Sequence, residues 1–318
     1  MYTSNEWGSL KKVVVGVADN AQIPQLDKSL RVVNYADVKD STTIKSGVYP
    51  QQVINEANED LEILSRFLTT CGVEVVRPTR GPVNYYNYCP RDTVITYKNK
   101  SIAAPMSLIS RDKEYLSYAE HLTNIVEIPN YLGEDVYNEN CVGDPDVLAL
   151  YETHPKFDAA NVIKANDHLM YLVSNSGNKA GAKILEEITG AKVHLLENVY
   201  SYMHIDSTVA FLREGLMLLN PSRIKSIDQL PEYFRNWDVI WAPEPIDIGH
   251  YPGYCHASTW INVNLLSVSP DLVILEEHQH ALRMLLQARG IECAMLPMRH
   301  SRTLGGCFHC VTLDLDRQ

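Results

Sequence analysis

The feature that most constrains the fold is a recurring order of elements. Hydrophobic patterning predicts two short strands, a helix and a third strand within residues 92–128. Residues 92–97 and 101–104 resemble strands joined by a turn, 111–122 the helix, and 125–128 the last strand. A unit of this kind that returns along a chain indicates a repeat architecture.

The same order returns in the rest of the chain, although the sequences of the units do not match. Further units are predicted at residues 162–195, 208–241 and 260–296, and a fifth is split between 309–315 and 12–76. The expected helices are 51–70, 179–189, 227–234 and 278–289, and the expected strands include 260–266 and 309–315. Five such units predict an α/β fold closed into a ring, in which strands from both ends of the sequence share one blade.

Three long segments interrupt the repeat, at residues 19–50, 129–156 and 243–257. Segments this long in a compact fold usually carry function or are disordered. Because they are rich in Gly, Pro, Asn, Tyr and acidic residues, we expect them to form the walls of a site. The tyrosines expected there are Tyr131, Tyr137, Tyr151, Tyr251 and Tyr254, whose rings offer flat apolar faces with a polar tip.

Reactive side chains occupy the same place in every unit, at or just before its first strand. In chain order they are Asp92, Asp158, His204 with Asp206, Ser258, and His309 with Cys310. Equivalent positions in a closed ring face one shared axis. We therefore expect these side chains to converge on a single pocket.

Each of these residues also has an ordinary structural interpretation. Asp92 follows Arg91 and could form a surface ion pair, and Asp158 could cap a turn. His204 and Asp206 could be half of a metal site, or a buried hydrogen-bonded pair. The stretch 305–310 could be a tight turn into a strand. The matching positions in the repeat, rather than any one residue, favour a functional site.

A thiol, an imidazole and several carboxylates in one pocket suit a planar, cationic electrophile. Carboxylates bind a guanidinium group through paired hydrogen bonds. The bound cation would in turn favour the thiolate form of a cysteine nucleophile. A Cys-His-Asp set for peptide hydrolysis would not need three acidic residues. The pattern therefore predicts chemistry on a guanidino group.

Charge and cysteine content exclude other classes of function. The net charge of −11 argues against nucleic acid and against an anionic membrane surface as partners. No apolar run reaches the roughly 18 residues needed to span a bilayer, and the first residues lack a signal-peptide pattern, so a cytoplasmic location is expected. The seven cysteines include one C-x-x-C pair, Cys307 and Cys310, with no second pair that would complete a zinc site.

Several stretches resemble the arginine amidinotransferases, the group that holds glycine amidinotransferase and inosamine-phosphate amidinotransferase. The resemblance covers nearly the whole chain. The stretches are NEWGSL at 5–10, CPRD at 89–92, FDAAN at 157–161, MHIDST at 203–208, LNPSR at 219–223 and LGGCFHC at 304–310. The resemblance implies a five-bladed, pseudo-symmetric α/β propeller of ββαβ modules, the pentein fold, and a single catalytic domain over residues 1–318.

The resemblance also implies roles for individual residues. Cys310 corresponds to the nucleophile, His204 to the general acid and base, and Asp158 to its partner. The residues expected to bind substrate are Asp92 and Asp206 as a guanidinium clamp, Arg223 with Ser258 at the α-carboxylate, and Ser201 and Met203. Asn161 stands where the family often has Asp, and Cys307 where it often has Gly, so Cys307 receives no role.

The implied reaction is ping-pong transfer of the amidino group of L-arginine to an amine, with release of L-ornithine and without metal or cofactor. Ser201 stands where the glycine-accepting enzymes have Asn. We therefore expect an acceptor larger than glycine, such as one used in natural-product biosynthesis. The partners expected are small molecules, with a homodimer as the candidate assembly. An arginine deiminase or dihydrolase of the same fold, and a non-catalytic arginine-binding protein, are the alternatives.

Overall fold

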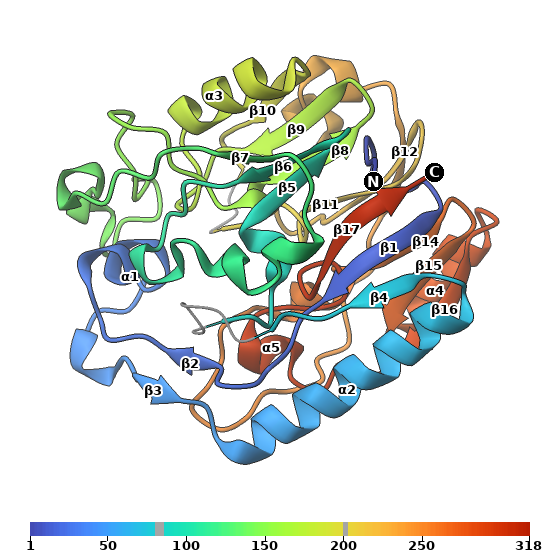
Figure 1. Ribbon diagram of the computed structural model, residues 1–318, viewed down its shortest axis with the longest axis horizontal. Helices are drawn as coiled ribbons and strands as arrows, with labels where there is room; N and C mark the ends of the chain where they lie inside the picture. Colours follow the sequence, from blue (N-terminus) through green and yellow to red (C-terminus); the bar gives the residue numbers. More distant parts are fainter. Residues whose placement is uncertain (80–85, 200–202) are drawn as a thin grey trace.

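The computed structural model describes residues 1–79, 86–199 and 203–318. Within them, five three-stranded sheets share one topology: a central strand pairs antiparallel with one neighbour and parallel with the other. The expected five-unit α/β arrangement is therefore confirmed. Helices α2, α3 and α4 lie at the periphery of the sheets (Figure 1).

Four of the sheets are continuous in sequence, and in each the chain runs through the antiparallel partner, then the central strand, then the parallel partner. They are β5 (Val94–Tyr97), β6 (Lys100–Ala103) and β7 (Ile125–Glu127); β8 (Val162–Ala165), β9 (His168–Leu172) and β10 (Lys192–Leu196); β11 (Val209–Arg213), β12 (Leu216–Leu219) and β13 (Asp238–Trp241); and β14 (Leu266–Ser269), β15 (Leu272–Glu276) and β16 (Glu292–Leu296).

The fifth sheet joins the two ends of the sequence. Its central strand β1 (Leu10–Val15) pairs antiparallel with β17 (Thr312–Arg317) and parallel with β4 (Glu74–Val76). The register places Leu10 opposite Arg317 and Val15 opposite Thr312. Figure 1 shows the two chain ends beside this sheet. The predicted split unit is therefore present, with the short ribbon β2 (Gln22–Ile23) and β3 (Gly47–Val48) inserted before α2.

The helices form where apolar periodicity and caps agree. Helix α2 (Gln51–Thr70) buries Val53, Ala57, Leu61, Leu64 and Leu68, a spacing of three to four residues that gives one apolar face. Helix α3 (Lys179–Thr189) begins where the Asn178 side chain accepts from the Gly181 amide, and ends at Gly190 in the left-handed conformation. The remaining helices are α1 (Lys28–Val33), α4 (His280–Gln287) and α5 (Ser301–Leu304).

Two expected helices are absent from the described structure, and one is shorter than expected. Residues 111–122 form 3-10 turns instead, because Lys113 has a φ of 59°, which an α-helix cannot accommodate. Residues 227–234 form two 3-10 turns on either side of Pro231, which has extended backbone angles and no N–H to donate. Helix α4 begins two residues after the predicted start and ends two residues before the predicted end.

Two expected strands begin later in the chain than the pattern suggested. Residues Thr259–Val263 form a 3-10 helix, so β14 starts only at Leu266. Strand β17 starts at Thr312, because the amides of His309 and Cys310 are bound by the side chain of Asn264 and not by a neighbouring strand.

Apolar clusters fill the space between neighbouring sheets. Charged residues, by contrast, meet where the first strands of these sheets approach one another. One apolar cluster joins Met170 and Phe211 of neighbouring sheets. By contrast, Arg91 binds Asp314 at 2.7 Å, and Lys164 lies 3.5 Å from Glu6, all four being buried. Among the described residues, no helix combines the length and apolar character needed to cross a membrane.

Candidate active site

The predicted reactive residues line one cavity of about 800 Å³. Each stands in a short turn or loop just before the first strand of its sheet. The lining includes Asp92, Asp158, Met203, His204, Asp206, Arg223, Ser258 and Cys310. Of the predicted site residues, only Ser201 lies outside the described structure. The geometry thus brings together side chains that are up to 218 residues apart in sequence, because Asp92 and Cys310 face the same space.

His204 is held between two carboxylates. Its Nε2 lies 3.0 Å from Oδ2 of Asp158, and its Nδ1 lies 3.6 Å from Oδ1 of Asp92. Asp158 is fixed in turn by the backbone N–H and hydroxyl of Ser107, at 2.9 and 2.8 Å. The backbone of His204 has a φ of 23°, a conformation that non-glycine residues adopt rarely and that is often found at functional sites.

The protonation of His204 follows from these neighbours. Burial lowers the pKa of this imidazole, but the charge of Asp92 and the hydrogen bond and charge of Asp158 outweigh burial and raise the pKa to about 9. Burial also opposes ionisation of Asp158, yet the hydrogen bond with His204 keeps the pKa of that carboxyl below its ordinary value. At neutral pH the pair is an imidazolium and a carboxylate, and it can therefore donate a proton.

Asp92 is buried, and among the described residues only one of its oxygens accepts a hydrogen bond, although the other lies 3.6 Å from Nδ1 of His204. Its Oδ2 binds Arg111 at 2.6 Å, and the same guanidinium binds Glu114 at 2.7 Å. Its Oδ1 has no hydrogen-bond partner among the described residues. Burial raises the pKa of Asp92, although His204 and Arg111 oppose this shift. A buried carboxylate oxygen without a donor, in the wall of a cavity, is suited to bind an N–H group of a ligand.

Cys310 lies at the junction of three polar side chains. Its Sγ lies 3.1 Å from Oδ2 of Asp206 and 3.2 Å from Nδ2 of Asn264, and its thiol also interacts with Cys89. The hydrogen bond with Cys89, burial and the charge of Asp206 raise the pKa of Cys310 well above its usual range. Without a ligand, the thiol is therefore protonated. A cation bound against Asp206 would offset these effects.

Cys307 differs from Cys310 although both are buried. It is absent from the described lining of the large cavity, and burial raises the pKa of its thiol. Asn264, by contrast, contacts Cys310 through both ends of its amide, since Oδ1 also accepts from the Cys310 N–H at 3.2 Å. Sequence reasoning missed Asn264, Ser107 and Arg111, because nothing in their local sequence distinguishes them from ordinary polar residues.

Arg223 approaches the cavity beside the strand that follows His204. One of its terminal nitrogens donates to Ser207 Oγ at 2.7 Å and to Thr208 Oγ1 at 2.8 Å. Ser258 also lines the cavity, directly before the 3-10 helix Thr259–Val263. We call Asp92, Asp158, His204, Asp206, Arg223 and Cys310 the charged wall.

A second set of lining residues is uncharged. We call Asn34, Tyr35, Tyr49, Ser110 and His256 the neutral wall. The His256 ring packs edge-on to both tyrosines, with centroids 6.2 Å from Tyr35 and 5.9 Å from Tyr49. Burial lowers the pKa of His256 to about 4, so its imidazole is neutral at pH 7. Asn34 Oδ1, Ser110 Oγ and His256 Nε2 are buried and have no hydrogen-bond partner within the part of the chain that the structure describes.

The long segments contribute unequally to this wall. Segments 19–50 and 243–257 supply Tyr35, Tyr49 and His256, as expected of walls. Segment 129–156 supplies no described lining residue, and none of its tyrosines, nor Tyr251 or Tyr254, is among the lining. The prediction that those five tyrosines wall the pocket is wrong, because Tyr137 is buried in the core and Tyr131 and Tyr151 face outward.

The described residues contain no group of three or more His, Cys, Asp or Glu side chains arranged to hold a metal ion. His204 has carboxylates at both nitrogens, and Cys310 has Asp206, Asn264 and Cys89 as neighbours. These contacts form a hydrogen-bonded acid–base and nucleophile arrangement.

Comparisons with known proteins agree with this geometry. The chain is 38% identical to inosamine-phosphate amidinotransferase 1 of Streptomyces glaucescens, over 98% of this chain and 95% of that protein. It is 29% identical to the L-arginine:L-lysine amidinotransferase of Pseudomonas savastanoi pv. phaseolicola, over 98% and 93%. The solved structure of inosamine-phosphate amidinotransferase StrB1 from Streptomyces griseus superposes with a TM-score of 0.94 at 38% identity, covering 99% of this chain and 96% of that one.

No model of a protein family matches the chain. The identity to the Streptomyces glaucescens enzyme nevertheless extends over nearly the full length of both proteins, and it is accompanied by the same fold in the StrB1 structure. The five-sheet architecture is that of the pentein fold, and the chain belongs to the amidinotransferase family.

Proposed function

We propose that this amidinotransferase moves the amidino group of L-arginine to an amine through a covalent amidino adduct on Cys310, and releases L-ornithine. The observation that carries the proposal is the charged wall: a thiol, an imidazolium and three carboxylates face one cavity. Support for arginine as donor comes from the Pseudomonas relative, whose name specifies L-arginine. Residues 1–318 would act as a single catalytic domain.

In the proposed first half-reaction, Asp92 Oδ1 and Asp206 accept hydrogen bonds from the guanidinium, and Arg223 with Ser258 binds the α-carboxylate. The bound cation lowers the pKa of Cys310, whose thiolate attacks the guanidino carbon. The bond from that carbon to Nε of arginine breaks, and His204 donates a proton to this nitrogen, which becomes the δ-amino group of ornithine. Ornithine then leaves, and the amidino group stays on Cys310.

In the second half-reaction, an acceptor amine enters and His204, now neutral, removes a proton from it. The amine nitrogen attacks the amidino carbon, the carbon–sulfur bond breaks, and Cys310 is restored. Asp158 keeps the His204 ring oriented throughout, through the 3.0 Å hydrogen bond. Met203 precedes His204 in the cavity lining and would shape the space beside the adduct. No step uses a metal or a cofactor.

The acceptor in this proposal is larger than glycine and contacts the neutral wall. The cavity of about 800 Å³ exceeds what arginine alone fills, since ligand sites of 300–1,000 Å³ hold drug-sized molecules. The Streptomyces glaucescens relative, which is named for inosamine phosphate, is more similar to this chain than the relative named for lysine. An aminocyclitol of a natural-product pathway is therefore the first acceptor to test.

The decisive experiment is incubation with guanidino-labelled arginine and a mixed panel of amines, followed by mass spectrometry of every guanidinylated product. The panel contains glycine, lysine, ornithine and aminocyclitols with and without phosphate, at equal concentration. Labelled guanidinylated product, formed together with an equal amount of ornithine, supports transfer. Labelled ammonia or citrulline without product would make the protein a hydrolase. If glycine gives the highest specificity constant, the proposed acceptor class is wrong.

A further inference from the structure

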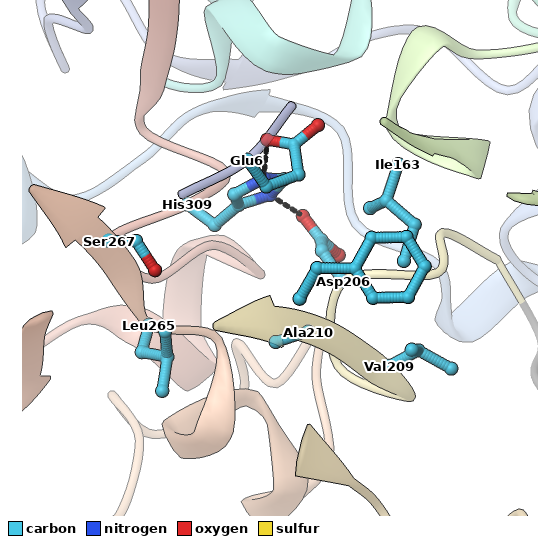
Figure 2. Close-up of a pocket in the computed structure, with 9 residues that line it drawn as sticks. Glu6, Ile163, Asp206, Val209, Ala210, Leu265, Ser267 and His309 are labelled. Carbon is cyan, nitrogen blue, oxygen red and sulfur yellow. Dashed lines mark hydrogen bonds and ion pairs between the residues drawn. The ribbon is translucent and has the colours of Figure 1, made fainter. Parts of the chain in front are cut away.

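One buried histidine adjoins the candidate nucleophile but is not used in the proposed reaction. His309 precedes Cys310, and its Nδ1 lies 3.0 Å from Oδ2 of Asp206. Its other nitrogen, Nε2, lies 3.4 Å from Oε2 of Glu6 (Figure 2). The Cys310 thiol reaches the same Asp206 oxygen at 3.1 Å. A continuous line of contacts therefore runs from Cys310 through Asp206 and His309 to Glu6.

His309 faces away from the large cavity. A separate small void is lined by Glu6, Asp206 and His309, together with apolar side chains such as Leu265 and Val209. Figure 2 shows the imidazole between the two carboxylates on this side. Asp206 also lines the large cavity, whereas His309 is not among the described lining of that cavity. The hydrogen bond to Asp206 therefore connects the His309 ring to the large cavity.

The surroundings favour a charged imidazole. Burial and the nearby cation of Arg91 lower the pKa of His309, but its hydrogen bonds to Asp206 and Glu6 outweigh them and raise it. Glu6 is itself held as a carboxylate, since its Oε1 accepts from the Lys164 N–H at 3.0 Å and lies 3.5 Å from Lys164 Nζ. With a carboxylate on each side, both ring nitrogens are donors.

We propose that His309 is a positioning residue, which as an imidazolium anchored by Glu6 holds Asp206 in place and compensates its negative charge beside the Cys310 thiol. This inference rests on the proposed roles of Cys310 and Asp206. Both described donors to Asp206, the imidazole and the thiol, reach Oδ2, so Oδ1 is left for the substrate guanidinium. Loss of the imidazolium would leave an uncompensated carboxylate next to the nucleophile and disfavour its thiolate.

The test is the rate of Cys310 alkylation by iodoacetamide as a function of pH, without substrate, followed on the Cys310 peptide by mass spectrometry. The groups that act most strongly on this thiol are Cys89, Asp92 and Asp206, and the substitution leaves them in place. His309→Asn keeps a donor near the Nδ1 position and removes the charge. We expect the midpoint of its alkylation rate against pH to rise by about one pH unit. This is at the lower end of the pKa shifts caused by losing a charge a few ångströms away.

The control is His300→Asn, because His300 is also a buried imidazole paired with one carboxylate, Glu56 at 2.7 Å, and it is not among the described cavity lining. Its alkylation profile should match the wild type. An unshifted profile in His309→Asn, or equal shifts in both variants, would overturn the inference. Because no turnover is measured, this result is independent of whether arginine is the donor.

A second measurement uses the unmodified protein, in case His309→Asn does not fold. In a sample labelled with 15N-histidine, the imidazoles of His204 and His309 should both keep their two nitrogens protonated from pH 6 to 8, and the signal that remains in His204→Asn is assigned to His309 and should shift when Cys310 is alkylated. A His309 resonance typical of a neutral ring at pH 7 would refute the charged form. Unchanged amidino transfer in that case would leave the proposed function standing without this role for His309.

Discussion

The charged wall and the neutral wall of the cavity are built in different ways. Residues of the charged wall come from turns beside sheet strands, before the first strand or, for Arg223, after the central one, and ion pairs or hydrogen bonds fix them, as with His204 and Asp158 at 3.0 Å. Residues of the neutral wall come mainly from the long segments, and several of their buried polar atoms have no partner among the described residues.

This difference suggests that the two walls serve two substrates with different demands. A guanidinium requires fixed carboxylates, since each charge-assisted hydrogen bond contributes about 1.5–3 kcal/mol. An acceptor amine requires a fitting surface, and a loop can change this surface without disturbing the sheets. Under the proposed function, the charged wall should decide whether the donor reacts, and the neutral wall which acceptor is used.

The largest effect is expected at Cys310. Cys310→Ser should reduce ornithine release by more than about 10³-fold, as expected for loss of a covalent nucleophile, while calorimetry still detects arginine binding. In the wild type, an acid quench with arginine alone should leave an amidino mass on Cys310. Cys307→Ser, the matched control, should retain turnover per folded molecule. An adduct on Cys307 would reassign the nucleophile and remove Cys310 from the charged wall.

A large pH dependence should follow from the same wall. Attack needs the Cys310 thiolate together with protonated His204, but the free protein at pH 7 holds both protons, since the pKa of His204 is raised to about 9. One proton must therefore leave before reaction. We expect kcat/KM for arginine to rise by about tenfold per pH unit up to pH 9 and then to level. Ornithine initial rates from pH 6 to 10 test this, and a falling profile from pH 7 would contradict it.

Removal of one clamp charge should have an intermediate effect. Asp92→Asn should lower kcat/KM for arginine by about 10- to 100-fold, the equivalent of one charge-assisted hydrogen bond. Asp60→Asn is the control, because Asp60 is equally buried and ion-paired with an arginine, Arg299 at 2.8 Å, but is not in the described lining. It should cost stability without changing kcat/KM. Equal kinetics for Asp92→Asn and wild type would remove Asp92 from the clamp.

Arg223 tests how far the charged wall extends. Arg223→Ala should lower the specificity constant for arginine about tenfold more than that for agmatine, because agmatine lacks the α-carboxylate. Arg302 also lines the cavity, but it is paired with Asp247 at 2.6 Å. Arg302→Ala should therefore leave the ratio of the specificity constants for arginine and agmatine unchanged. Specificity constants for both donors give the result. Equal losses for arginine and agmatine in Arg223→Ala would place the carboxylate elsewhere.

The smallest effect is expected at the neutral wall. Ser110→Ala removes one neutral hydrogen-bonding group, so KM for the acceptor should rise about three- to tenfold. The rate of adduct formation from arginine, measured in a single turnover, should stay the same and serves as the internal control. A slower first half-reaction would show that Ser110 acts on the donor, and the division between the two walls would then fail.

The sequence predicted the repeat and the positions of the reactive residues better than it predicted individual elements. Short apolar runs located the central strands, such as 101–104 for β6, because a strand buried on both faces has a nearly continuous apolar sequence. The patterning failed at residues 111–122, where Arg111 and Glu114 are drawn into an ion pair beside Asp92 and Lys113 breaks the helix. It also missed Asn264, whose contacts with Cys310 depend on a pairing across 46 residues that no local pattern records.

The joining of β1 with β17 has a consequence for how this protein acquires activity during folding. Cys310 is placed by the turn that leads into β17, and β17 pairs with a strand about 300 residues earlier in the chain. Such a distant pairing forms slowly, because a long loop must close before any contact is gained. A chain with the other four sheets already formed would still lack Cys310 in position and would expose an unpaired strand edge. The onset of ornithine release during refolding would therefore report the final closure of the ring.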